Sequence, residues 1–219
     1  MPELPPPAPP ETRTAGQLVA ESMRLYGRRL PVALALGVLP TAVMAALVGL
    51  DDVPLRTRYA LAATAGVALI SIAYVGAAAV ASERRVDAGT AFRAFAAGWL
   101  VLLPVPFLAG FLLLPALAWF ALLGLVVPVV VVERLPLRAA LGRAITLARV
   151  DYGHALGSMA AVTIVAAVTA LMLQYLLIQF GETTGGIAAF IAVFMLSPLL
   201  LLAASLLYFD QEARLSRRL

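Results

Sequence analysis

The chain has 219 residues, of which 63% are hydrophobic and 13% charged, with a mean hydropathy of +0.97. Soluble domains are close to half apolar, so this composition predicts one membrane domain and no sizeable soluble one. The chain contains no cysteine, which excludes disulfides, thiolate catalysis and cysteine-ligated metals. All 16 basic residues are arginine and the net charge is +4. In a membrane protein this charge indicates topology and anionic lipid rather than nucleic acid.

The N-terminal region predicts a tail followed by an amphipathic helix. Residues 1–13 carry six prolines and predict a disordered cytoplasmic tail. Thr14 and Gln17 then have capping-box spacing, and a helix is expected over residues 14–29. Its polar face carries Gln17, Glu21, Arg24 and Arg28. We expect this helix to lie along the membrane interface as an elbow, although a simple extension of the next span has the same pattern.

The longest uncharged stretch covers residues 99–132. A straight helix of this length would measure about 51 Å, against a hydrocarbon core of ~30 Å. It is too long for one span and slightly short for two, and Pro115 suits the first turn of a new helix. Two further amphipathic elbows are expected near residues 87–95 and 137–148. The predicted membrane segments are 30–50, 59–81, 99–114, 115–132, 155–180 and 187–208.

The arginine count predicts the topology. If residues 99–132 return to the same side, 14 arginines lie with the N-terminus and only Arg56 and Arg58 lie opposite. A single crossing would leave seven against nine. The positive-inside rule therefore favours six segments with both termini in the cytoplasm. Residues 99–132 then form either two full spans or a shallow re-entrant hairpin. The fold class is an all-α polytopic bundle with three elbows, in which residues 14–210 form the membrane domain and 211–219 a basic tail.

Aromatic residues are expected at the two membrane interfaces. The predicted segments put Tyr59 and Trp119 near the outer interface. The same segments put Trp99, Tyr152 and Tyr208 near the inner one.

Few side chains offer chemistry. No predicted span has an acidic or basic residue in its interior, which argues against an ion-coupled transporter. Gln174 and Ser197 are the candidate intramembrane polar site, although an ordinary interhelical hydrogen bond would also explain Gln174. Asp151 and His154 are expected to solvate a helix end. No catalytic residue, metal site or cofactor is predicted, and the chain is not expected to be an enzyme.

Three short motifs carry a resemblance to a known family. They are "GQLVAESMRLYGRRLPVALAL" near the start, Glu133 followed by "LRAALGRAITLAR", and "LLYFDQEAR" at the end. Together they resemble the bacterial glycerophosphoryl diester phosphodiesterase membrane domain family and related bacterial membrane proteins of unknown function. The elbow motif of that family matches Glu133, Ala140, Leu141, Arg143 and Leu147, with Ala144 where serine is usual. Its terminal motif matches Tyr208, Phe209 and Asp210, with Glu212 where arginine is usual and Arg214 two residues later.

The resemblance implies a stand-alone membrane module, because the soluble phosphodiesterase domain fused to some relatives is absent here. Glu133, Arg143 and Asp210 form the expected structural motif, in which elbow arginines pair with carboxylates at span ends. The expected lipid-headgroup contacts are Arg24, Arg28, Arg138, Arg143 and Arg149.

We therefore expect a non-enzymatic scaffold or lipid-associated accessory module of the bacterial inner (plasma) membrane. Its partners are expected to be anionic lipids and an unidentified membrane protein, but not nucleic acid. The alternative function is a permease or lipid-translocating protein.

Overall fold

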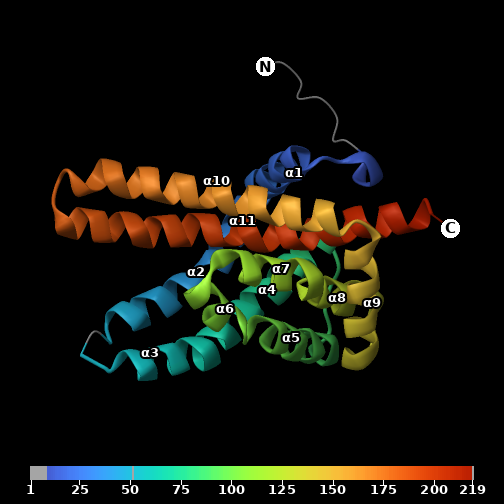
Figure 1. The fold of residues 1–219 in the computed structure, drawn as a ribbon, viewed down its shortest axis with the longest axis horizontal. Helices are drawn as coiled ribbons and strands as arrows, with labels where there is room; N and C mark the ends of the chain where they lie inside the picture. The colour runs from blue at the N-terminus through green and yellow to red at the C-terminus, as the bar shows by residue number, and fades with distance from the viewer. Residues whose placement is uncertain (1–8, 51, 219) are drawn as a thin grey trace, which may run out of the picture.

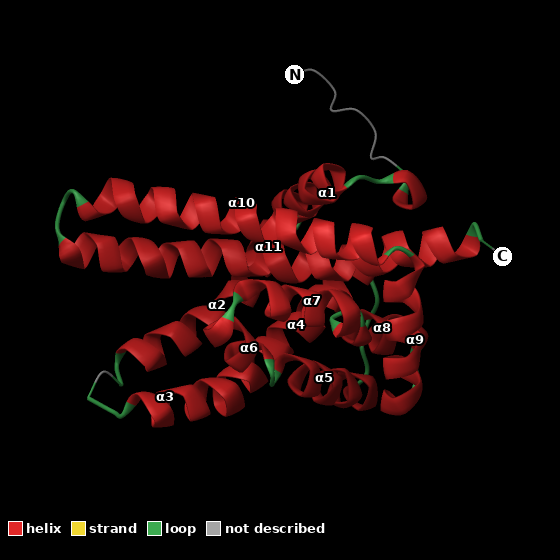
Figure 2. Cartoon of the chain, in the orientation of Figure 1, coloured by secondary structure: helices red, strands yellow, loops and turns green. Residues whose placement is uncertain are grey.

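The computed structural model describes residues 9–50 and 52–218, and over these residues the chain is helical without strands (Figure 2). Six apolar helical segments are long enough to span a membrane, which confirms the prediction of a multi-pass helical membrane protein. Several of them are interrupted. The segments are α2 (Leu30–Val48), Leu55–Ser82, Ala88–Gly110, Leu113–Glu133, α10 (Tyr152–Ile178) and α11 (Glu182–Ser216).

The interruptions divide three segments into shorter helices. The segment Leu55–Ser82 contains α3 (Leu55–Leu61), the π-helical turn η2 (Ala62–Gly66) and α4 (Val67–Ser82). The next two contain α5 (Ala88–Leu102), α6 (Val105–Phe111), α7 (Leu113–Leu123) and α8 (Val126–Glu133). Outside the six segments lie η1 (Pro10–Thr12), α1 (Ala15–Arg28) and α9 (Leu137–Val150).

The bundle has two chemically different ends (Figure 1). We call one the basic end; it holds the α4–α5 and α8–α9 connections, α9 and the C-terminal turns of α11. The other is the loop end, where α2 joins α3 and α10 joins α11. Helix α9 lies across the long helices at the basic end, and its buried face packs on α7, α8 and α11. Helix α1 packs on α10 and α11.

Glycine allows the closest helix crossing in the bundle core. Helix α2 crosses α11 at Gly37, where an added Cβ would lie 2.0 Å from the backbone oxygen of Phe194. No side chain fits at that distance. Small residues at such crossings let transmembrane backbones approach closely, which increases van der Waals contact where lipid removes the hydrophobic driving force.

The region 88–133 differs from the predicted boundaries. Asp87 caps α5 by accepting the backbone N–H of Thr90, and α5 continues without a break past Trp99. The second expected elbow is therefore the first part of the third segment. Helix α5 ends at Leu102, and α6 ends at Phe111, before the extended residue Leu112. Helix α7 begins at Leu113, so Pro115 lies in its first turn.

Pro128 leaves a backbone carbonyl without its helical donor at the break between α7 and α8. Pro128 has no N–H to donate to the carbonyl of Gly124, four residues earlier. The buried hydroxyl of Tyr74 donates to that carbonyl instead, at 2.7 Å. An unsatisfied backbone group inside a bilayer is costly, so the break between α7 and α8 depends on this side chain from α4.

The indole groups of both tryptophans donate hydrogen bonds to backbone carbonyls of the bundle. Trp119 was expected at the outer interface, but its indole N–H donates to the carbonyl of Val101 in the last turn of α5. The neighbouring carbonyl of Ala118 accepts from Tyr152, the first residue of α10 at the basic end. Trp99, expected at the inner interface, donates to Thr64 in η2, beyond the far end of α4. Both indoles thus bond to the protein, and their places relative to the membrane interfaces stay a prediction.

Candidate functional site

A buried ion pair lies at the basic end. The guanidinium of Arg13 lies 2.6 Å from Asp210, and the two side chains are 7% and 0% exposed. The other carboxylate oxygen of Asp210 lies 3.5 Å from Nε2 of His154, which in turn lies 3.5 Å from the hydroxyl of Ser158. Asp210 therefore joins three parts of the chain, namely the residue before α1, the start of α10 and the end of α11.

A second pair continues this network. Arg214 binds the Asp151 carboxylate at 2.7 Å and donates to the backbone oxygen of Arg13 at 2.7 Å. Gln211 donates to the Asp151 carbonyl, and Asp151 caps α10 through the backbone N–H of His154. Asp151 therefore serves the helix end, as expected, whereas the His154 side chain is only 9% exposed and turns to Asp210.

Glu133 forms a separate cluster with α9 and α11. Its carboxylate accepts from Nε of Arg143 at 3.2 Å and from the Tyr208 hydroxyl at 2.9 Å. Arg143 also binds Glu212 at 2.5 Å. Partial burial lowers the pKa of Arg143, but the hydrogen bond that Arg143 donates to Glu133 and the charges of both carboxylates outweigh burial, and the net shift of the pKa is upward. Arg143 thus stays cationic and holds α9 against α8 and α11.

The residues expected from sequence divide into paired and exposed groups. Arg143 faces two carboxylates, so its guanidinium is committed to the protein and not to headgroups. Arg24 and Arg28 both pair with Glu21, although Arg28 remains 63% exposed. Arg138 and Arg149 are exposed on α9, and no described residue pairs with them. Further arginines are exposed at the basic end: Arg29, Arg84, Arg85, Arg93, Arg134, Arg217 and Arg218.

Two partners were missed in the sequence. Arg13 was assigned to the proline-rich tail, but residues 10–12 form a 3-10 turn and Arg13 is buried; residues 1–8 lie outside the described part. The available signal was its position directly before the capping box at Thr14. His154 was considered only with its neighbour Asp151, whereas Asp210 on α11 is its partner. Helix α11 also continues beyond Asp210 to Ser216, into the expected basic tail.

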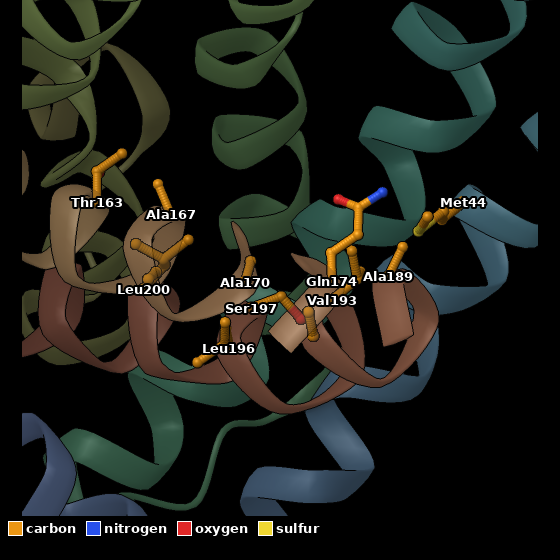
Figure 3. Close-up of a pocket in the computed structure, with 12 residues that line it drawn as sticks. Met44, Thr163, Ala167, Ala170, Gln174, Ala189, Val193, Leu196, Ser197 and Leu200 are labelled. Atoms are coloured by element: carbon orange, nitrogen blue, oxygen red, sulfur yellow. The ribbon is translucent and has the colours of Figure 1, made fainter. Parts of the chain in front are cut away.

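A groove lies between α10 and α11, with Met44 of α2 at its edge (Figure 3). Its volume is about 340 Å³ and its lining is mostly alanine and other apolar residues. Gln174 and Ser197 both line it. Gln174 is exposed, and the Ser197 hydroxyl is buried without a hydrogen-bond partner among the described residues. The interhelical hydrogen bond considered for Gln174 does not form within the described chain.

The buried ion pairs hold the helices of the basic end together, whereas the exposed arginines can bind ligands. Among residues 9–50 and 52–218, no three histidine, aspartate or glutamate side chains converge as a metal site. Comparison with protein-family models, curated proteins and solved structures finds no match to this chain.

Proposed function

We propose that this is a non-enzymatic multi-pass membrane protein whose basic end binds anionic lipid, as a lipid-associated accessory module. The charge distribution carries this proposal. The loop end has only Arg56 and Arg58. The other 14 arginines lie in four stretches outside it, from Arg13 to Arg29, Arg84 to Arg93, Arg134 to Arg149 and Arg214 to Arg218. Each exposed arginine near an anionic surface contributes about 1 kcal/mol to attraction. The resemblance to the glycerophosphoryl diester phosphodiesterase membrane domain agrees with a stand-alone module of this kind.

The basic end is proposed to face the cytoplasm of a bacterial inner membrane, with both termini on that side. Helix α9 then lies in the headgroup region, since it crosses the long helices and buries only one face. Arg138 and Arg149 point away from its buried alanines and can reach phosphates. Helix α1 is proposed as an interfacial elbow in addition to α9, with Leu18 and Leu25 buried against α10 and α11.

The hairpin of α6 and α7 is proposed to be re-entrant. Ala118 contacts Tyr152 at the start of α10, and the hairpin tip at Leu112 is six residues from Ala118, or about 9 Å. From Tyr152, α10 continues for roughly 39 Å to Ile178. In Figure 1 the α6–α7 turn accordingly lies well short of the α10–α11 loop. The tip sequence "GFLLLP" has no polar residue, as suits hydrocarbon rather than water.

Cysteine labelling tests this placement, since the natural chain has no cysteine. Single cysteines at Thr57, Leu114, Thr184 and Ser216 each report one position. We expect labelling from outside at Thr57 and Thr184 only. Labelling of Leu114 from outside would show two full spans instead, and labelling of Ser216 from outside would overturn the orientation.

Lipid binding is tested on the purified full chain. We expect phosphatidylglycerol to raise the melting temperature in neutral detergent more than phosphatidylcholine does. The double variant Arg138→Gln, Arg149→Gln should bind phosphatidylglycerol more weakly, by about 2 kcal/mol in total. The matched control Arg56→Gln, at the loop end, should not change binding. Equal stabilisation by the two lipids would contradict the proposal.

The groove supports a second candidate function, lipid translocation. A mostly apolar groove of about 340 Å³ with three polar side chains, Thr163, Gln174 and Ser197, offers a path for a lipid along α10 and α11. Proteoliposomes with fluorescent phospholipid measure this directly. If the groove is the path, Gln174→Leu with Ser197→Ala should slow transfer while Thr169→Val, outside the groove, should not. Absence of protein-dependent transfer would leave the accessory role as the function.

A further inference from the structure

A basic pocket lies between the start of α2 and the end of α4. Its volume is about 460 Å³. Three arginines surround it, namely Arg29 before α2 and Arg84 and Arg85 after α4. Val32, Ala79 and Val80 form its apolar wall, and Glu83 completes the lining. None of these residues was singled out by sequence patterns, because Arg29 and Arg85 are 56 residues apart in the chain.

The local structure explains why the arginines gather here. Glu83 ends α4 in the left-handed conformation, with φ of 52°, and the backbone N–H of Arg84 returns to the carbonyl of Ala79. This turn keeps Arg84 and Arg85 beside the last turn of α4. Arg29 comes from the other helix and binds Glu83 at 3.1 Å, with side chains 53% and 73% exposed.

The charges of the pocket are not balanced. Glu83 offsets one arginine, and Arg84 donates one hydrogen bond to the backbone oxygen of Val132. Arg85 is exposed and no described residue pairs with it. The lining therefore carries a net charge of +2. The N-terminus of the 19-residue α2 opens beside Val32 and adds positive potential from its dipole.

The apolar wall indicates which anion fits. Next to the pocket, α2 and α4 are in close contact. A Cβ added at Gly76 would lie only 2.5 Å from Cδ2 of Leu36. Val32 is 46% exposed and Ile72, further along α4, is 49% exposed. A charged head among arginines with apolar surface leading into the membrane matches a phospholipid. Guanidinium groups bind phosphate oxygens in paired hydrogen bonds, which suits this chemistry.

We propose that Arg29, Arg84 and Arg85 form a site for a phosphate group, supplied by the headgroup of an anionic phospholipid whose acyl chain lies along α2 and α4. This rests on the proposed function, because it identifies one specific site on the lipid-binding end. The site differs from the surface of α9, where Arg138 and Arg149 are exposed on a single helix.

The experiment titrates phosphatidylglycerol, phosphatidylcholine and inorganic phosphate against the full-length protein in zwitterionic detergent. Arg85→Gln is the test variant, since Arg85 holds no protein contact that the fold requires. Arg217→Gln, at the end of α11, is the matched loss of one exposed arginine. We expect Arg85→Gln to weaken phosphatidylglycerol binding about fivefold, the equivalent of ~1 kcal/mol, and Arg217→Gln to leave it within twofold.

The other outcomes separate the two proposals. If both variants weaken phosphatidylglycerol binding equally, the pocket is not a specific site, while the proposal of general lipid binding by the basic end is retained. Binding of inorganic phosphate that depends on Arg85, without preference for phosphatidylglycerol, would keep the pocket, assign it to free phosphate and overturn the lipid-binding function. If no ligand depends on Arg85, the pocket is not a phosphate site.

Discussion

Neutralising Asp210 should destabilise the protein far more than neutralising an exposed carboxylate in a similar pair. Asp210→Asn keeps the shape of the side chain but removes the negative charge that lies 2.6 Å from the Arg13 guanidinium, in a pair whose side chains are 7% and 0% exposed. Removing one partner from a buried pair typically costs about 3–5 kcal/mol, because the remaining charge stays desolvated. For a chain of this size that corresponds to a fall in melting temperature on the order of 10 °C.

Glu83→Gln is the matched control, because the Glu83–Arg29 pair also joins a carboxylate to a guanidinium but is largely exposed. Such pairs contribute roughly 0–1 kcal/mol. Thermal unfolding of both variants in the same detergent, followed by intrinsic fluorescence, gives the comparison. The double variant Arg13→Met, Asp210→Leu should recover most of the loss, because it leaves no unpaired charge. Equal shifts for Asp210→Asn and Glu83→Gln would refute this reasoning.

Three further predictions concern packing and capping, each measured by melting temperature in detergent. Gly37→Leu should destabilise by more than 1–3 kcal/mol, about the cost of ordinary overpacking, whereas Gly157→Ala, which meets no atom within 4 Å, should be neutral or better. Tyr74→Phe should cost about 1–3 kcal/mol because it leaves the buried Gly124 carbonyl unsatisfied; an unchanged melting temperature would mean that another donor replaces the hydroxyl. Asp87 has a pKa lowered by its backbone and hydroxyl hydrogen bonds at the start of α5, so its stabilising effect is complete above the unfolded-state pKa, about 3.9, and is lost as pH falls through the folded value. The destabilisation by Asp87→Ala should therefore be present at pH 7 and shrink below roughly pH 4; a difference independent of pH would contradict it.

The six apolar segments could be predicted because each needs only local information. Hydropathy marks the spans, and Pro115 marks the start of α7 within three residues. The hydrogen-bond partners of Trp99 and Trp119 could not be predicted, because the carbonyls of Thr64 and Val101 come from other helices and are far away in the sequence.

The same limit applies to charged side chains. Glu133 and Arg143 are ten residues apart on either side of one turn, so their contact lies within the range of a local pattern. Arg13 and Asp210 are 197 positions apart, and no local sequence pattern around either residue indicates the other as its partner. The sequence could indicate only that a carboxylate at a span end requires a partner.

Burial gives the arginines of the basic end two different uses. Arg13, Arg143 and Arg214 bind carboxylates inside the protein and join α9, α10 and α11 to the start of the chain. These contacts hold the helices at this end in place without lipid. The exposed arginines of α9 and of the α2–α4 pocket then sit on a preformed surface. A ligand that binds there does not bear the free-energy cost of ordering the helices, so its binding energy can be used for the contact itself. The buried pairs thus prepare the basic end for the anion that the exposed arginines attract.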